Sequence, residues 1–125
     1  MSQTIINSNP LDKHPLDKSE VRKLILDNGV RVYLLSDPSF NVSAASMVVE
    51  TGSLENPDDR QGLAHFLEHM LFLGSQTFPD PSAFGHFLNL QGGQHNAWTG
   101  TEFTNYHFDC NANALPQALE FFSAM

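Results

Sequence analysis

The segment from Gly62 to Leu73 constrains this chain most, because it is apolar except for three ionisable side chains. His65, Glu68 and His69 interrupt a run of Leu, Ala, Phe and Met residues. At about 100° per residue, a helix places the two histidines about 40° apart, with Glu68 on the flank of the same stripe. The pattern predicts a helix that is buried on all sides and turns three polar groups in one direction.

Burying two imidazoles and a carboxylate is costly unless they are hydrogen-bonded, paired with opposite charge or bound to a metal. Residues 61–125 contain no Lys or Arg that could pair with Glu68. Two imidazoles at i and i+4 match zinc, and the adjacent carboxylate is placed to take a proton from water. We therefore interpret the group as a zinc site; the alternative is three hydrogen-bonded core side chains.

Composition limits the classes of protein to which the chain can belong. Its 125 residues carry 6 Lys+Arg and 14 Asp+Glu, for a formal net charge of -8. That length allows at most one domain, and 41% hydrophobic residues is too many for a disordered chain. The acidic balance predicts no nucleic-acid partner and no membrane partner, because both need basic residues facing phosphates.

Cysteine content and the first residues bear on the compartment. Cys110 is the single cysteine, so no internal disulfide is possible, and we expect it to be a small core residue. Residues 1–10 have neither the basic nor the apolar region of a secretory signal. We predict a cytoplasmic location and disfavour a periplasmic one.

The charges are unevenly distributed along the chain. All six basic residues lie within positions 1–60, and residues 61–125 carry only acidic charges. A free-standing domain needs a charged, mixed surface, so we expect other polypeptide to cover this part. A helix capped by Asn113 runs to Met125 with no stop signal. The chain is therefore expected to be a fragment that is truncated in mid-helix.

Hydrophobic patterning predicts an α+β fold of order βββααββα, with an antiparallel sheet and helices packed on one side. Asn28-Gly29 predicts a type I′ hairpin turn. Residues 1–20 are expected to be an N-terminal arm, and residues 21–125 one incomplete domain. The expected strands are 21–27, 30–35, 42–50, 95–99 and 103–110, and the expected helices are 62–73, one that begins at Asp80-Pro81 and stops at Gly92-Gly93, and one that begins at Asn113.

The order of residues 65–69 is the H-x-x-E-H motif of the inverzincins. From about Val21 onward the chain resembles the insulinase/pitrilysin family of zinc peptidases. The segments that carry this resemblance are Gly62–Gly74, Asn96-Ala97-Trp98-Thr99, Thr104-Asn105-Tyr106 and Leu26-Asp27-Asn28-Gly29.

The resemblance implies a zinc metalloendopeptidase that hydrolyses peptides and small unfolded polypeptides, with one Zn²⁺ per catalytic site. It makes His65 and His69 metal ligands and Glu68 the general base. The third ligand would be a glutamate on a later helix, expected beyond Met125; Glu102 and Glu120 are alternatives inside the chain. Residues 21–125 would then be the first part of the metallopeptidase N-terminal domain.

The resemblance also implies that Asn96, Ala97, Trp98 and Thr99 form an edge strand to which substrate adds as a further strand. Trp98 would line a side-chain pocket, although a core tryptophan is an equally good interpretation. Gly92-Gly93 would allow a close approach of the backbone at the site or simply end a helix. His86, His95 and His107 are interpreted as surface or hydrogen-bonded histidines.

Two rival functions remain open at this point. One is a non-catalytic peptide-binding or structural subunit with the same fold, and the other is a two-histidine metal site without a catalytic role. The expected partners are a peptide substrate and the missing C-terminal part of the same protein. We expect the isolated chain to be inactive.

Overall fold

The computed structural model describes residues 3–5 and 14–125, which divide into two units. The N-terminal unit ends at Phe40, and the C-terminal unit runs from Asn41 to Met125. Residues 1–2 and 6–13 of the expected arm lie outside the described residues. The expected boundary at residue 20 between an arm and a domain stays a prediction.

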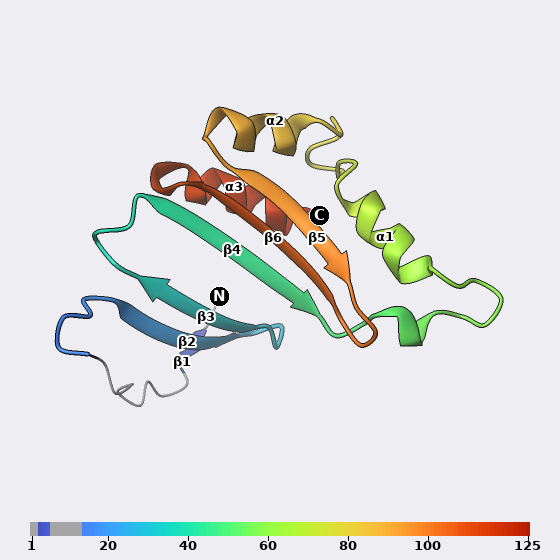
Figure 1. Cartoon of the computed structure of the whole chain (residues 1–125), viewed down its shortest axis with the longest axis horizontal. Helices are drawn as coiled ribbons and strands as arrows, with labels where there is room; N and C mark the ends of the chain where they lie inside the picture. Colours follow the sequence, from blue (N-terminus) through green and yellow to red (C-terminus); the bar gives the residue numbers. More distant parts are fainter. Residues whose placement is uncertain (1–2, 6–13) are drawn as a thin grey trace. The chain divides into compact units, whose positions relative to one another are not determined.

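The N-terminal unit is a three-stranded antiparallel sheet of order β1-β2-β3 (Figure 1). It contains β1 (Gln3–Ile5), β2 (Glu20–Leu26) and β3 (Arg31–Ser36). The strand β1 was not expected, because its three residues lie in a polar stretch without an alternating pattern. It pairs with β2 in the register Thr4 to Ile25.

The hairpin between β2 and β3 forms where Asn28-Gly29 predicts it, but the predicted type I′ turn is wrong. Only Gly29 has a positive φ, of 85°, whereas type I′ needs positive φ at both central residues. The Gly29 N–H donates to Leu26 O and the Leu26 N–H donates to Val30 O. This is a three-residue loop that ends in a left-handed glycine, and the Asn28 side chain supports it by accepting from the Val30 N–H.

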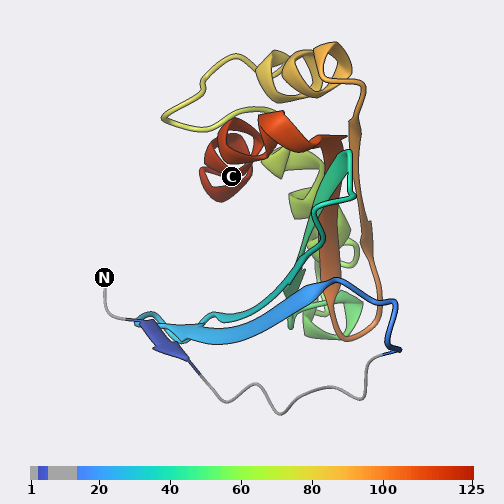
Figure 2. The same ribbon diagram turned by 90° about the vertical axis from the view of Figure 1, so that its left-hand side faces the viewer.

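The C-terminal unit packs three helices against one face of a second antiparallel sheet, of order β4-β6-β5 (Figures 1 and 2). From β2 onward the expected order βββααββα and the expected α+β class are confirmed. The elements are β4 (Val42–Val49), α1 (Leu63–Leu71), α2 (Ala83–Leu90), β5 (Gln94–Thr99), β6 (Thr104–Asn111) and α3 (Leu115–Ser123), with short 3₁₀ helices η1 (Ser53–Glu55) and η2 (Ala112–Ala114).

The core of this unit lies between β6, α2 and α3. Alternate residues of β6 point to the same face, so Tyr106, Phe108 and Cys110 turn together toward the helices. The expectation that Cys110 is a core residue is confirmed. The buried residues are Phe84, Leu88, Tyr106, Phe108, Cys110, Ala114, Ala118 and Phe122.

Two of the expected helix starts are displaced. Asp80 lies two residues before the N-cap Ser82 of α2, and it accepts hydrogen bonds from both the backbone and the hydroxyl of Ser82. These bonds lower the pKa of Asp80. Asn113 does not cap the last helix but lies inside η2, whose N-cap is Asn111. An Asp or Asn side chain can accept from a backbone N–H two residues on without beginning an α-helix, as Asp80 does from Ser82 and Asn111 does from Asn113.

The expectation that α1 is buried on all sides is wrong. Glu68 is its one buried residue, and Phe66 and Leu67 are exposed at 61% and 54%. Helix α1 lies beside β5, and nothing in the described part of the chain covers its outer side (Figure 1). An apolar sequence predicts that a helix will be covered, but burial needs a partner surface that these residues do not supply. Among the described residues, no helix is both long enough and apolar enough to cross a bilayer.

Candidate metal centre

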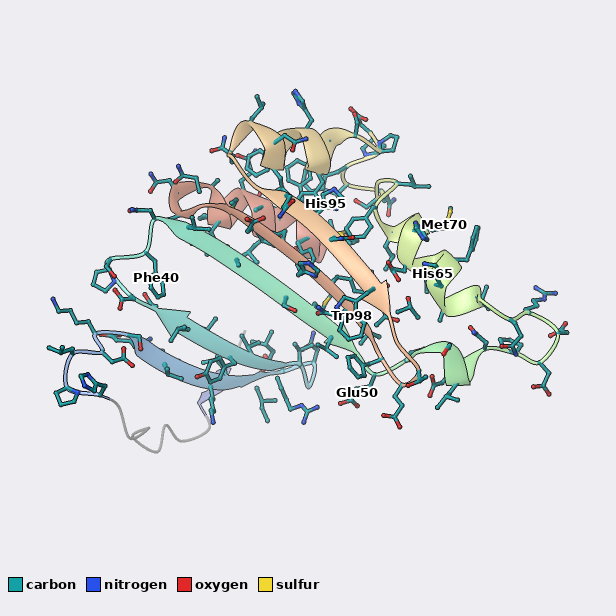
Figure 3. All side chains as sticks on the ribbon, viewed as in Figure 1. Phe40, Glu50, His65, Met70, His95 and Trp98 are labelled. Carbon is teal, nitrogen blue, oxygen red and sulfur yellow. The ribbon has the colours of Figure 1, made fainter. Side chains whose placement is uncertain are left out.

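Helix α1 carries the three side chains that the sequence singles out. It begins after Gly62, whose φ of 86° suits a residue without a Cβ. The Asn56 side chain accepts from the Ala64 N–H and so satisfies one of the free donors in the first turn. The helix then places His65 beside the end of β5 that carries Trp98 (Figure 3).

His65, Glu68 and His69 converge as the helical spacing predicts. One potential ligand atom from each of the three lies within 4.8 Å of the others. The Nε2 atoms of His65 and His69 are 3.1 Å apart. At this distance one ring can donate a proton to the other, or both can turn lone pairs toward one cation.

The donor set fits zinc. Two nitrogens bound tetrahedrally at about 2.0–2.1 Å from zinc are about 3.3 Å apart, so the 3.1 Å separation needs little adjustment. Catalytic zinc sites commonly use three protein ligands and keep one open position. Both imidazoles are exposed, which leaves room for a further ligand and for water. No other His, Cys, Asp or Glu within residues 3–5 and 14–125 joins the group.

Glu68 differs from the two histidines because it is buried, at 6% exposure. The Thr99 hydroxyl on β5 donates a hydrogen bond to Glu68 Oε2. Burial raises the pKa of Tyr106 on β6, and the negative charge of Glu68 raises it further. The carboxylate is therefore held in the space between α1 and the sheet, with a hydroxyl as its donor in place of a basic side chain.

The four residues of the expected substrate strand lie on β5 but face different directions. Strand β5 is an edge strand, since β6 is its one partner in the described sheet. Because side chains alternate along a strand, Ala97 and Thr99 face the helices, whereas Asn96 and Trp98 face the opposite side. Trp98 is 46% exposed and packs edge-on against Phe103, so the interpretation as a core tryptophan is wrong.

The other candidates lie outside the cluster. Glu102 and Glu120 are exposed and do not join the three-residue group. His86 is exposed. His95 and His107 are half-buried and do not join the group, and each has a buried Nδ1 atom without a hydrogen-bond partner among the described residues.

Gly93 has a structural role, because a Cβ there would lie 1.9 Å from the carbonyl oxygen of Asp109. Its neighbour Gly92 ends α2 with a φ of 69°. Both glycines are thus explained by the junction between α2 and β5.

Sequence reasoning missed the contact between Thr99 and Glu68. Alternation along β5 predicts that Thr99 and Ala97 share a face, but it does not tell which helix lies against that face. The only signal in the sequence was the lack of Lys and Arg in residues 61–125, which leaves a hydroxyl or an amide as the donor to Glu68.

Comparison with known proteins decides the family. The sequence profile described as "Insulinase (Peptidase family M16)" matches residues 31–125. The chain belongs to this family. It is 44% identical to human insulin-degrading enzyme over 115 residues and 42% identical over 122 residues to an Arabidopsis thaliana protein named insulin-degrading enzyme-like 1, peroxisomal.

The fold agrees with that of a solved member of the insulinase family. A crystal structure of pitrilysin superposes with a TM-score of 0.90 at 36% sequence identity. The match covers 98% of this chain and 13% of the pitrilysin chain. Likewise, the alignments cover 92% of this chain but 11% of the human enzyme, and 98% of this chain but 13% of the Arabidopsis protein. The chain thus corresponds to a small part of its relatives' length.

Proposed function

We propose that the protein containing this chain is a zinc-dependent metalloendopeptidase that hydrolyses peptide bonds in peptides and small unfolded polypeptides. The observation that carries the proposal is the convergence of His65, Glu68 and His69 within 4.8 Å on one side of α1. Membership of a peptidase family supports it. One Zn²⁺ would be held by His65 and His69, with a third ligand from polypeptide beyond Met125.

The residues of this chain would have separate roles: His65 and His69 would hold the cation, and Glu68 would transfer protons. When bound, zinc supplies a Lewis acid that polarises the scissile carbonyl and makes water more acidic. Glu68 accepts a proton from the attacking water and passes it to the leaving amine. The buried position of Glu68 restricts its motion, and the exposed histidines leave the cation site open to substrate.

Strand β5 would bind the substrate. Its free edge offers main-chain hydrogen-bonding groups to an extended peptide, which would lie as an added strand beside α1. Main-chain bonding makes little demand on the peptide sequence, in keeping with action on varied peptides. Asn96 and Trp98 face away from Glu68, so their contribution would be to substrate side chains or to the strand itself.

The test replaces Glu68 by Gln in the complete protein, with His86→Ala as the control because that histidine is exposed and outside the cluster. Zinc content is measured by elemental analysis and cleavage with an internally quenched peptide. Glu68→Gln should retain zinc and lose turnover by a factor of about 10² to 10⁴, the usual contribution of a general base. The control should retain both.

The outcomes separate the candidate functions. Unchanged cleavage by the Glu68→Gln variant would remove Glu68 as the base. A wild-type protein that binds zinc and peptide without cleaving it would instead be the non-catalytic peptide-binding subunit.

A further inference from the structure

Thr99 occupies a special position in the C-terminal unit, because it belongs to β5 while its side chain reaches α1. Its hydroxyl donates to Glu68 Oε2. Glu68 is the one buried residue of α1. Within residues 3–5 and 14–125, no other hydrogen-bond donor to this carboxylate is found.

This single bond has a geometric consequence for the carboxylate. A glutamate side chain has three rotatable bonds, and its terminal torsion is broad when nothing restrains it. Binding Oε2 to a fixed strand restricts that torsion and leaves Oε1 as the oxygen free to accept from water. The restrained oxygen, Oε2, faces the strand. Ligand atoms, one each from His65, Glu68 and His69, lie within 4.8 Å of one another.

We infer that Thr99 is a positioning residue, which holds the Glu68 carboxylate in place for proton transfer. The inference rests on the proposed peptidase function. Thr99 belongs by its backbone to the strand that would bind substrate, and by its hydroxyl it holds the base. One residue thus sets the distance between the general base and the scissile bond of a peptide lying on β5.

A merely structural hydroxyl would act differently. If Thr99 only stabilised the fold, its loss would lower stability, and zinc content and substrate binding would fall along with turnover. A positioning role predicts a fall in kcat with KM and zinc content retained, because alignment of the base matters in the transition state.

The experiment uses the complete protein and three substitutions. Thr99→Val removes the hydroxyl at nearly constant shape, Thr99→Ser keeps it, and Thr104→Val is the matched control. Thr104 pairs with Thr99 across the two strands; it is buried, whereas Thr99 is half-buried, and its hydroxyl donates to Thr51 O on another segment.

We expect Thr99→Val to lower kcat about 10- to 100-fold while KM changes less than about 3-fold. Thr99→Ser should restore kcat to within about 3-fold of wild type, and Thr104→Val should leave kcat unchanged. Zinc content should be the same in all four proteins. A Thr99→Val variant with wild-type kcat, or a Thr99→Ser variant as slow as Thr99→Val, would overturn the inference.

A second readout does not depend on activity. The apparent thermal midpoint of the zinc-free protein is measured for Thr99→Val, Glu68→Ala and the double variant. Thr99→Val should lower the midpoint when Glu68 is present and not when it is absent, because the lost bond then has no acceptor. Equal effects in both backgrounds would overturn the inference.

The two proposals fail in different ways. An active wild-type protein whose kcat is unaffected by Thr99→Val refutes only the positioning role. A wild-type protein with no peptidase activity refutes the proposed function and the positioning role together.

Discussion

At the scale of single residues, the buried Glu68 and the half-buried His95 show two surroundings that this chain gives to polar side chains without basic partners. Glu68 receives a hydroxyl, whereas His95 has aromatic neighbours. The His95 ring stacks between Phe72 and Phe84, with centroid distances of 4.5 and 5.2 Å. Its Nδ1 atom is buried without a hydrogen-bond partner in the described part of the chain. A neutral imidazole is the form that such a position tolerates.

His95 should therefore make the protein less stable in mild acid. Burial lowers the pKa of His95 below its ordinary value of 6.5. The unfolded chain then binds a proton at a higher pH than the folded chain does. The contribution that neutral His95 makes to the free energy of unfolding is fully present above pH 6.5. It is lost progressively as the pH falls through 6.5 toward the lowered pKa of the folded state.

The measurement compares thermal midpoints of the wild type and a His95→Phe variant at pH 7.5 and at pH 5.5. The fall between the two pH values should be smaller in the variant, whose ring cannot be protonated and still fills the aromatic slot. His86→Phe, at an exposed position, is the matched control and should follow the wild type. Parallel curves for His95→Phe and the wild type would contradict the prediction.

At the scale of elements, the tight junction between α2 and β5 determines where β5 lies. The Gly93 N–H donates to Leu88 O, which fastens the strand to the end of the helix. The Gly93 backbone also lies directly against β6, and no side chain fits between them. This close approach fixes the register of β5 on β6, and with it the position of Thr99 opposite Glu68.

Gly93→Ala should therefore be markedly destabilising. A Cβ would lie 1.9 Å from the Asp109 carbonyl oxygen, which belongs to the backbone and can move only if the strands move. We expect a loss of about 1–3 kcal/mol or more in the free energy of unfolding, measured by urea denaturation.

The neighbouring glycine provides the control for this substitution. Gly92→Ala meets no atom within 4 Å and suffers only from the φ of 69°. It should cost about 1–2 kcal/mol. A Gly92→Ala variant less stable than Gly93→Ala would show that backbone conformation, and not the close approach of the strands, dominates at this junction.

At the scale of the whole molecule, an exposed apolar surface on α1 adjoins the candidate zinc site. Phe66, Leu67 and Met70 are each more than 40% exposed. Residues 61–125 contain no Lys or Arg whose charge could offset this apolar surface. The relatives are far longer than this chain, which covers 11% of the human enzyme. That other polypeptide covers residues 61–125 stays a prediction.

The isolated 125-residue chain should bind zinc more weakly than the complete protein and should not cleave peptides. The described residues bring together two histidine ligands, whereas catalytic zinc sites use three protein ligands. Competition with a chromophoric chelator measures the affinity, and a quenched peptide reports cleavage. A His65→Ala variant of the isolated chain should abolish the remaining binding. Tight zinc binding together with peptide cleavage by the isolated chain would refute this prediction.

Local sequence was sufficient to predict the direction of side chains on a helix or strand, because the periodicity of the backbone alone decides it. The spacing of His65 and His69 predicts their convergence, because the helix repeat fixes where residues i and i+4 point. Alternation along residues 104–111 predicts which side chains of β6 enter the core. Gly29 predicts the position of the hairpin, because glycine adopts positive φ easily. The turn type was not predicted, because Asn28 does not adopt positive φ.

The tertiary structure alone decided what surrounds those elements. The bond between Thr99 and Glu68 joins residues far apart in the chain, so it depends on how α1 packs beside β5 and not on any local pattern. The exposure of α1 and the choice of which face of β5 the helices cover are set in the same way. Sequence periodicity determines the direction of a side chain on its own element, whereas its partner is determined by long-range packing, in which many weak contacts are settled together.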